Sequence, residues 1–180
     1  LLIGFGLLSM LTAALFIVKQ GDFRRMLAYS SVEHMGLLLL GLGVGYAAAK
    51  GSVAHMVNHS LVKAALFLLA GKIVAKYASR SSYDITGLVK VAPLGSRLWL
   101  AGAIALVGAP PFALFWSEFF VLQGILQRGL LWVGIMYLII LGTVFVGMMT
   151  PVLHMYRGTP PPGMEEQPES LVALAPVALL

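Results

Sequence analysis

The sequence predicts an all-α integral membrane protein with five complete transmembrane helices and the start of a sixth. Two observations favour this fold class. Of the 180 residues, 59% are hydrophobic and only 11% are charged, a combination that soluble domains rarely show. Apolar runs near the length of about 20 residues that crosses a hydrocarbon core also recur along the chain. These runs are 1–18, 26–48, 52–75, 98–125 and 129–150.

The first helix, 1–18, is apolar throughout, and a short basic connection precedes the second helix, 26–48. The second helix contains Glu33 and His34 in the stretch "SSVEHMGLLLL", about 10 Å from its start. Water reaches that depth, so two interpretations stay open. In the first interpretation, the pair receives protons from the cytoplasm. In the second, Glu33 forms an ion pair with an arginine of the preceding connection.

The third helix, 52–75, carries His55, His59 and Lys63 at intervals of four residues, which places them on one face about 6 Å apart along the axis. Ionisable residues inside a membrane cost several kcal/mol unless they are paired or hydrated. Two cations about 6 Å apart repel by roughly 3 kcal/mol at an effective dielectric of about 20. Loading one site therefore lowers the proton affinity of the next, which suits proton transfer.

Two other interpretations of this face remain. The histidines could form hydrogen bonds between helices while Lys63 pairs with a carboxylate. Two histidines at i and i+4 could also chelate a metal ion together with Glu33 and His34, although a lysine one turn away opposes a cation. We expect no metal site, no cofactor and no catalytic residue. The absence of cysteine from the 180 residues excludes thiolate zinc sites and cysteine-ligated iron–sulfur clusters within them.

The fourth helix, 98–125, contains Pro110 and Pro111 in "VGAPPFALFWSEFF". Two prolines remove two backbone donors and prevent helix continuation, so we expect the helix to break there. Irregular backbone at membrane depth is tolerated only against protein or a water-filled cavity. Glu118 lies two turns beyond the break, and we expect it to store or release protons, with a structural ion pair as the alternative.

Three segments outside these spans are irregular. The connection "SRSSYDITGLVKVAPLGSR", 79–97, suits either an amphipathic piece on the membrane interface or a plain loop. After the fifth helix, 129–150, the proline- and glutamate-rich segment 157–169 is typical of an extended linker. We expect residues 170–180 to begin a truncated span, and the chain, which starts with leucine, to be a fragment.

The Lys and Arg residues predict the orientation, because they favour cytoplasmic connections. Nine of them lie in or near the connections after the first, third and fifth helices, whereas only Lys50 and Arg128 lie near the other two. We therefore expect a multi-pass protein of the inner (plasma) membrane whose first, third and fifth connections are cytoplasmic. The net charge of +5 is spread over helix ends next to the lipid bilayer, so we expect no nucleic-acid partner.

Four stretches, in this order, resemble a known family: "GDFRRMLAYSSVEHMG", "AHMVNHSLVKAALFLLAG", "DITGL" and "GAPPFALFWSEF". The chain is similar to the antiporter-like membrane subunits shared by respiratory complex I, Mrp-type cation/proton antiporters and energy-converting membrane-bound hydrogenases. The glutamate–histidine pair and "PPFALFWSEF" look most like the hydrogenase-4 component F branch. Ala109 and Trp116 depart from the usual residues at their positions, but neither departure removes an ionisable group.

The resemblance implies a fourteen-helix core of two inverted five-helix repeats, of which this chain would be the second. It also implies that the His55, His59 and Lys63 face contributes to a hydrated central axis, and that Glu118 takes the position of a lysine or glutamate that connects to the outside. The function implied is a proton-translocating subunit of a redox-driven complex. Its partners would be other membrane subunits and a peripheral hydrogenase or NADH-oxidising module. An antiporter without redox coupling, or a scaffold that conducts nothing, are the alternatives.

Overall fold

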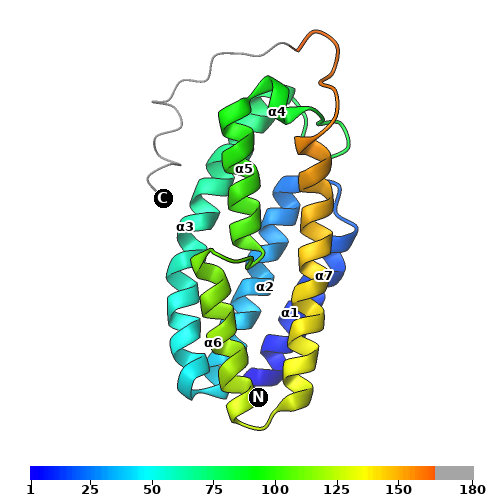
Figure 1. Ribbon diagram of the computed structural model, residues 1–180. Coiled ribbons are helices and arrows are strands. Elements are labelled where there is room, and N and C mark those ends of the chain that lie inside the picture. Colours follow the sequence, from blue (N-terminus) through cyan, green and yellow to red (C-terminus); the bar gives the residue numbers. More distant parts are fainter. Residues whose placement is uncertain (165–180) are drawn as a thin grey trace.

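The computed structural model describes residues 1–164 as a bundle of helices that run up and down (Figure 1). No strand occurs within these residues, which confirms the prediction of an all-α chain. The expected helix at 170–180 and the linker from 165 onward lie outside the described residues. The helices are α1 (Leu2–Val18), α2 (Phe23–Val44), α3 (Tyr46–Tyr77), α4 (Leu88–Val91), α5 (Pro93–Leu106), α6 (Ala113–Gln127) and α7 (Leu131–Tyr156).

Three of the described helices, α2, α3 and α7, are long and apolar enough to cross a membrane, and α1 is apolar but shorter. The span expected at 98–125 is divided between α5 and α6, which follow one another along the bundle (Figure 1). Residues 107–112 separate them. Because Pro110 and Pro111 have no amide hydrogen, the carbonyl groups of Leu106 and Val107 lack the donor four residues later that a continuous helix would supply.

The turn between α2 and α3 is tighter than the sequence predicts. Hydropathy predicts that the second helix reaches residue 48 and that the third begins at 52, but α2 ends at Val44 and α3 begins at Tyr46. Gly45 turns the chain with a φ of 77°, a conformation that glycine adopts without steric cost. At the other end of α2, the Asp22 side chain caps the helix by accepting a hydrogen bond from the Arg24 amide over 2.9 Å.

Glycines allow two pairs of helices to approach closely. In the contact between α1 and α2, a Cβ added to Gly6 would lie 2.7 Å from the Gly36 carbonyl oxygen. In the contact between α3 and α6, a Cβ added to Gly51 would lie 2.8 Å from the Ser117 carbonyl oxygen. Small residues at such points are a common way of packing helices in membranes, where apolar burial gives little driving force between helices.

The connection from α3 to α5 and the end of α7 meet at the same end of the bundle (Figure 1). The Gly87 amide donates to the Arg157 carbonyl over 2.7 Å, and the Thr86 hydroxyl donates to the Thr159 carbonyl over 2.7 Å. The segment 79–97 is therefore mainly a loop that is tied to the residues following α7. The amphipathic alternative is limited to α4, which has four residues.

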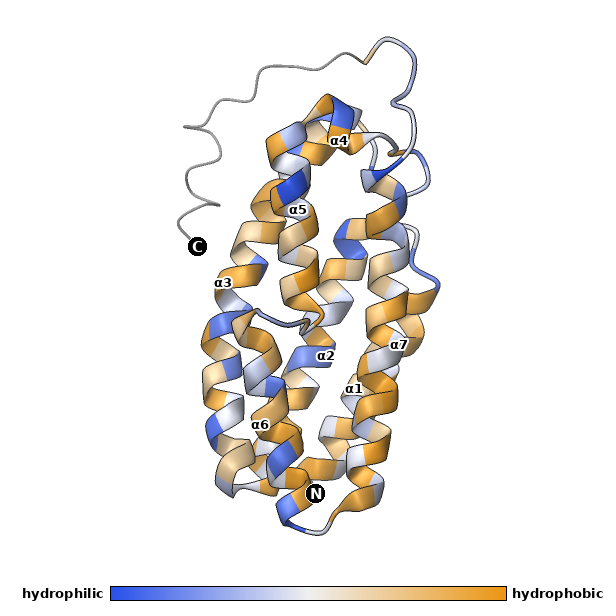
Figure 2. Ribbon diagram, viewed as in Figure 1, coloured by the Kyte–Doolittle hydropathy of each residue, from blue (hydrophilic) through white to orange (hydrophobic). Residues whose placement is uncertain are grey.

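Most residues of the helices are hydrophobic, and bands of hydrophilic residues interrupt α2, α3 and α6 (Figure 2). Large apolar side chains point outward on α1 and α7, such as Leu15 and Ile139, which are 66% and 62% exposed. An extensive apolar exterior marks a surface that other protein or lipid covers. The unusual feature of the fold is therefore the polar interior.

Candidate functional site

Nine polar side chains are buried on α2, α3 and α6; one of them, Ser52, donates to the Leu38 carbonyl over 3.3 Å, and we call the other eight the polar seam. All are buried, with exposed fractions between 0% and 7%. Six of them are the ionisable residues that the sequence singled out, and the other two are serines. The polar seam consists of Ser30, Glu33, His34, His55, His59, Lys63, Ser117 and Glu118.

Three histidine rings form the centre of the polar seam. His34 lies between the two histidines of α3, with ring centroids 4.9 Å from His55 and 4.4 Å from His59. The His55 and His59 rings lie 6.1 Å apart and nearly parallel, as their spacing on one helix face requires. A hydrogen bond of 2.9 Å joins Nδ1 of His34 to Nε2 of His55. The face predicted on the third helix is thus joined to α2.

Lys63 points from α3 toward α2. Its Nζ donates to the backbone carbonyl of Leu27 and, over 2.6 Å, to the hydroxyl of Ser30. Ser30 in turn donates to the Leu27 carbonyl over 3.0 Å. These acceptors are neutral, so the alternative in which Lys63 is held by hydrogen bonds to a carboxylate does not describe this arrangement. The amino group is hydrogen-bonded and buried near the middle of a long, apolar helix.

Glu33 has no exposed surface, and its Oε2 lies 3.4 Å from Nδ1 of His34. Neither carboxylate oxygen has a hydrogen-bond partner among the described residues. The alternative in which Glu33 pairs with an arginine near the interface is wrong, because Glu33 faces His34 and Arg25 pairs instead with Asp22 over 3.9 Å. That Glu33 and His34 receive protons from the cytoplasm stays a prediction.

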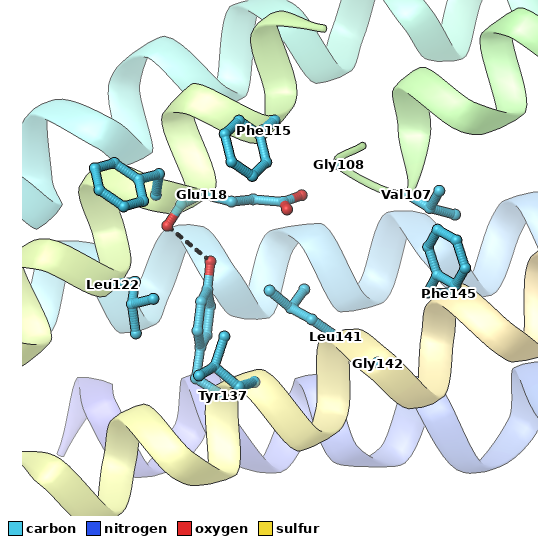
Figure 3. A pocket seen from close by; sticks show the side chains of 11 residues that line it. Val107, Gly108, Phe115, Glu118, Leu122, Tyr137, Leu141, Gly142 and Phe145 are labelled. Carbon is cyan, nitrogen blue, oxygen red and sulfur yellow. Dashed lines mark hydrogen bonds between the residues drawn. The ribbon is translucent and has the colours of Figure 1, made fainter. Parts of the chain in front are cut away.

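Glu118 lies at the break between α5 and α6, where its carboxylate points toward Gly108 (Figure 3). Gly108 adopts a φ of 66°, and any Cβ at this position would collide with the carboxylate. A pocket of about 280 Å³ adjoins the carboxylate, and its walls come from the break, α6 and α7. The Tyr137 hydroxyl, also in this pocket, donates to the backbone carbonyl of Glu118 over 3.2 Å.

Ser117 connects α3 to α6. Its Oγ lies 2.8 Å from Nδ1 of His55 and donates to the Leu114 carbonyl over 2.8 Å. The sequence patterns identify none of Ser30, Gly108, Ser117 and Tyr137 as site residues. A glycine two residues before a proline pair was a usable signal for Gly108. No local signal identifies the serines or Tyr137, because their partners lie on other elements.

One subset of the polar seam has the composition of a metal site. His34, His55 and Glu118 each offer a ligand atom, and these atoms lie within 4.8 Å of one another. Two imidazoles and a carboxylate suit borderline divalent cations. This set differs from the His55 and His59 chelate that the spacing on one helix suggests. The expected absence of a metal stays a prediction.

The arrangement is suited to proton transfer. Imidazole, carboxylate and amine groups each bind and release protons, and here they follow one another across three helices with a direct hydrogen bond between two of the imidazoles. Glu33, His34, His59 and Glu118 also keep buried oxygen or nitrogen atoms without a partner among the described residues. Such atoms are rare in structural polar clusters, where hydrogen bonds are usually complete.

Comparison with known proteins gives a consistent result. A family model described as NADH:quinone oxidoreductase/Mrp antiporter, TM matches residues 1–147. The chain is 39% identical over 129 residues to a hydrogenase-4 component F homolog of Methylacidiphilum infernorum, which covers 71% of this chain and 27% of that protein. It is 33% identical over 158 residues to NADH-quinone oxidoreductase subunit N of Desulforudis audaxviator, covering 86% of this chain and 31% of that one.

Two solved structures share the fold. A chain of the Mrp complex from a Dietzia species superimposes with a TM-score of 0.84 and 26% identity, covering 89% of this chain and 30% of its own. A chain of the membrane-bound sulfane sulfur reductase, an archaeal respiratory membrane complex, superimposes with a TM-score of 0.85 and 29% identity, covering 99% and 37%. The chain thus spans between 27% and 37% of the length of these four proteins.

Proposed function

Since the chain belongs to the NADH:quinone oxidoreductase/Mrp antiporter transmembrane family, we propose that it translocates protons as part of an antiporter-like subunit in a redox-driven membrane complex. The complex would be of the hydrogenase-4 or NADH-quinone oxidoreductase type, as the names of the similar proteins suggest. The observation that carries this proposal is the polar seam, a set of buried proton-binding groups on three adjacent helices.

The energetics of the polar seam support transport over a purely structural role. Each ionisable residue inside a membrane costs several kcal/mol unless it is paired or hydrated. A structural cluster would reduce that cost by completing its hydrogen bonds, yet Glu33 has neither carboxylate oxygen bonded. Groups that must gain and lose protons cannot be fixed in one fully bonded state. The incomplete bonding is therefore expected of a pathway.

The polar seam has two ends in this proposal. Lys63 extends from α3 to Ser30 of α2, and in this proposal it belongs to the hydrated central axis. Glu118 connects to the outer side of the membrane through the pocket beside the helix break. Glu33 and His34 pass protons between them or receive them from the cytoplasm. The 180 residues contain no cysteine that could ligate an iron–sulfur cluster, and in this proposal electrons move in another subunit.

We place the chain as the second of two inverted five-helix repeats, in a multi-pass protein of the plasma membrane. The charge distribution supports an orientation with the ends of α1, α3 and α7 on the cytoplasmic side, because the Lys and Arg residues gather there. These three ends lie together at one end of the bundle (Figure 1). Partners would be other membrane subunits and a peripheral hydrogenase or NADH-oxidising module.

Transport by the intact complex in proteoliposomes tests the proposal. Lys63→Ala and Glu118→Gln should each lower the number of protons moved per electron at least about tenfold, because each removes a proton-binding group from the pathway. Lys50→Ala is the matched control, since Lys50 is an exposed lysine near the beginning of the same helix, α3. Unchanged proton-to-electron ratios in both test variants would end the proposal.

A second function is exchange of protons for sodium without redox coupling. The superposition on a chain of an Mrp complex favours it, with a TM-score of 0.84. Both functions would use the same residues, so only the driving force separates them. A sodium gradient applied to proteoliposomes in the absence of a reductant should drive proton flux if this second function holds, and should drive none in a redox-coupled subunit.

A further inference from the structure

A chain of three hydrogen bonds runs through the contact between α2, α3 and α6. It begins at Nδ1 of His34, continues through both ring nitrogens of His55 and Oγ of Ser117, and ends at the Leu114 carbonyl, with lengths of 2.9, 2.8 and 2.8 Å. His34, His55 and Ser117 are all buried, with exposed fractions of 2%, 0% and 1%. Every proton in such a chain has a definite donor, so the positions of the protons can be counted.

The count starts at Leu114, because a carbonyl oxygen only accepts. Ser117 has a single hydroxyl proton, and it donates this proton to Leu114. Its oxygen must then accept from His55, which requires the hydrogen of the neutral His55 ring to lie on Nδ1. Nε2 of His55 consequently carries a lone pair, and the bond to His34 requires a hydrogen on Nδ1 of His34.

The opposite order of donors fits the surroundings less well. If Ser117 donated to His55, then Nε2 of His55 would donate to His34, and Nδ1 of His34 would present a lone pair to the Glu33 carboxylate only 3.4 Å away. In the first order, Nδ1–H of His34 faces that carboxylate instead, so the first order fits the position of Glu33 better.

We propose that Ser117 is a positioning residue that holds neutral His55 in the Nδ1–H tautomer and so keeps Nε2 of His55 ready to accept a proton from His34. The inference rests on the proposed function and deepens it. When His34 gains a second proton, its Nδ1–H bond breaks and the proton forms a new bond to Nε2 of His55, which becomes the imidazolium. With the other tautomer, Nε2 already carries a hydrogen and this transfer cannot occur.

Ser117 does not pass the proton onward, because its hydrogen-bond acceptor, the Leu114 carbonyl, is too weak a base to take up a proton. His55 is therefore a side branch that stores a proton next to His34 and returns it along the same bond. The other titratable groups around the pair are Glu33, His59, Lys63 and Glu118, and none of them has a hydrogen bond to Nδ1 of His55. Ser117 is therefore the only described group with a hydrogen bond to Nδ1 of His55, and it sets which nitrogen carries the hydrogen.

Solid-state ¹⁵N NMR of the intact complex with labelled histidine tests the tautomer directly, and a His55→Asn difference spectrum identifies the His55 signals. The native protein should show Nδ1 protonated and Nε2 unprotonated. Ser117→Ala should reduce the Nδ1–H population and lower transport by roughly two- to tenfold, the effect of one lost hydrogen bond between neutral groups. Ser117→Thr keeps the hydroxyl and should restore both.

Ser96→Ala is the matched control. Ser96 is equally buried on α5 and donates to a carbonyl three residues earlier, Pro93, but the structure gives it no histidine partner. The inference is wrong if native His55 carries its hydrogen on Nε2, or if Ser117→Ala leaves the tautomer unchanged. Those results leave the proposed function standing, whereas normal proton-to-electron ratios in Lys63→Ala and Glu118→Gln would remove the function and leave the tautomer assignment intact.

Discussion

Two helix contacts in this bundle are built in the same way and contain different side chains. Between α1 and α2, Gly6 and Gly36 bring the backbones together, and their neighbours are the apolar residues Met10 and Leu40. Between α3 and α6, Gly51 brings the backbone of α3 against the Ser117 carbonyl and next to Phe120, and one turn further along α3 the His55 ring bonds to the Ser117 hydroxyl. The contact between α1 and α2 joins two apolar surfaces, whereas the contact between α3 and α6 sets the distance between polar groups.

This difference shows how the polar seam is positioned. The hydrogen bonds of Lys63 go to neutral groups, and Glu33 has no bonded oxygen, so paired charges do not fix the geometry. The close approach of α3 and α6 does so instead, because it determines the 2.8 Å separation of His55 and Ser117. Densely packed interiors transmit small displacements, so steric changes at glycines should alter transport even though glycine has no titratable group.

The largest effect is expected at a third close approach, that of Gly108 to Glu118. Gly108→Ala would push the Glu118 carboxylate from its place, and misplacement of a reacting group by about 1 Å lowers rates by about a hundredfold. Proton transport by the reconstituted complex measures the loss. Gly129→Ala is the control, since Gly129 has a similar φ of 72° and open space around it. Equal losses in both variants would attribute the effect to backbone strain alone.

The comparison of the two helix contacts is tested by Gly51→Ala and Gly6→Ala. Each added methyl group meets backbone atoms, so each variant should lose roughly 1 to 3 kcal/mol of stability, seen as a lower melting temperature. Gly51→Ala should also lower transport by about tenfold, because it separates His55 from Ser117 by a fraction of an ångström. Equal transport in the two variants would contradict a special role for the contact of α3 with α6.

The smallest effect is expected at the edge of the polar seam. Tyr137→Phe removes the hydrogen bond to the Glu118 backbone carbonyl and should cost about 1 kcal/mol of stability while changing transport by less than about twofold. Thermal melting of the purified complex measures the first quantity. Tyr83→Phe, which removes the hydroxyl of a tyrosine that is 72% exposed, should leave the melting temperature unchanged. A large transport loss in Tyr137→Phe would instead place its hydroxyl in the pathway.

Local patterns predicted part of this structure. The face formed by His55, His59 and Lys63 follows from helical spacing alone, and the interruption at Pro110 and Pro111 follows from the missing amide hydrogens. The position of the α2 end did not follow from hydropathy, because Gly45 lies in a run that is apolar on both sides and a turn there leaves the average unchanged.

The tertiary contacts of the site could not be predicted in this way. His34 meets His55 because α2 and α3 pack at a particular rotation, and that rotation depends on the shapes of many side chains. Depth estimates also misled the interpretation of Glu33. Its distance from the helix end predicts access to water, but the packed bundle buries it completely. A single sequence gives helix faces well and the pairing of those faces poorly.

The irregular backbone at 107–112 has a final consequence for mutagenesis. The carbonyl oxygens of Leu106 and Val107 receive no backbone hydrogen bond from positions 110 and 111, because both positions are proline and proline has no amide hydrogen. They contribute negative partial charge at mid-height of the bundle, and this charge belongs to the main chain. An alanine scan leaves main-chain oxygens in place, so it would record the interior near Glu118 as less polar than it is.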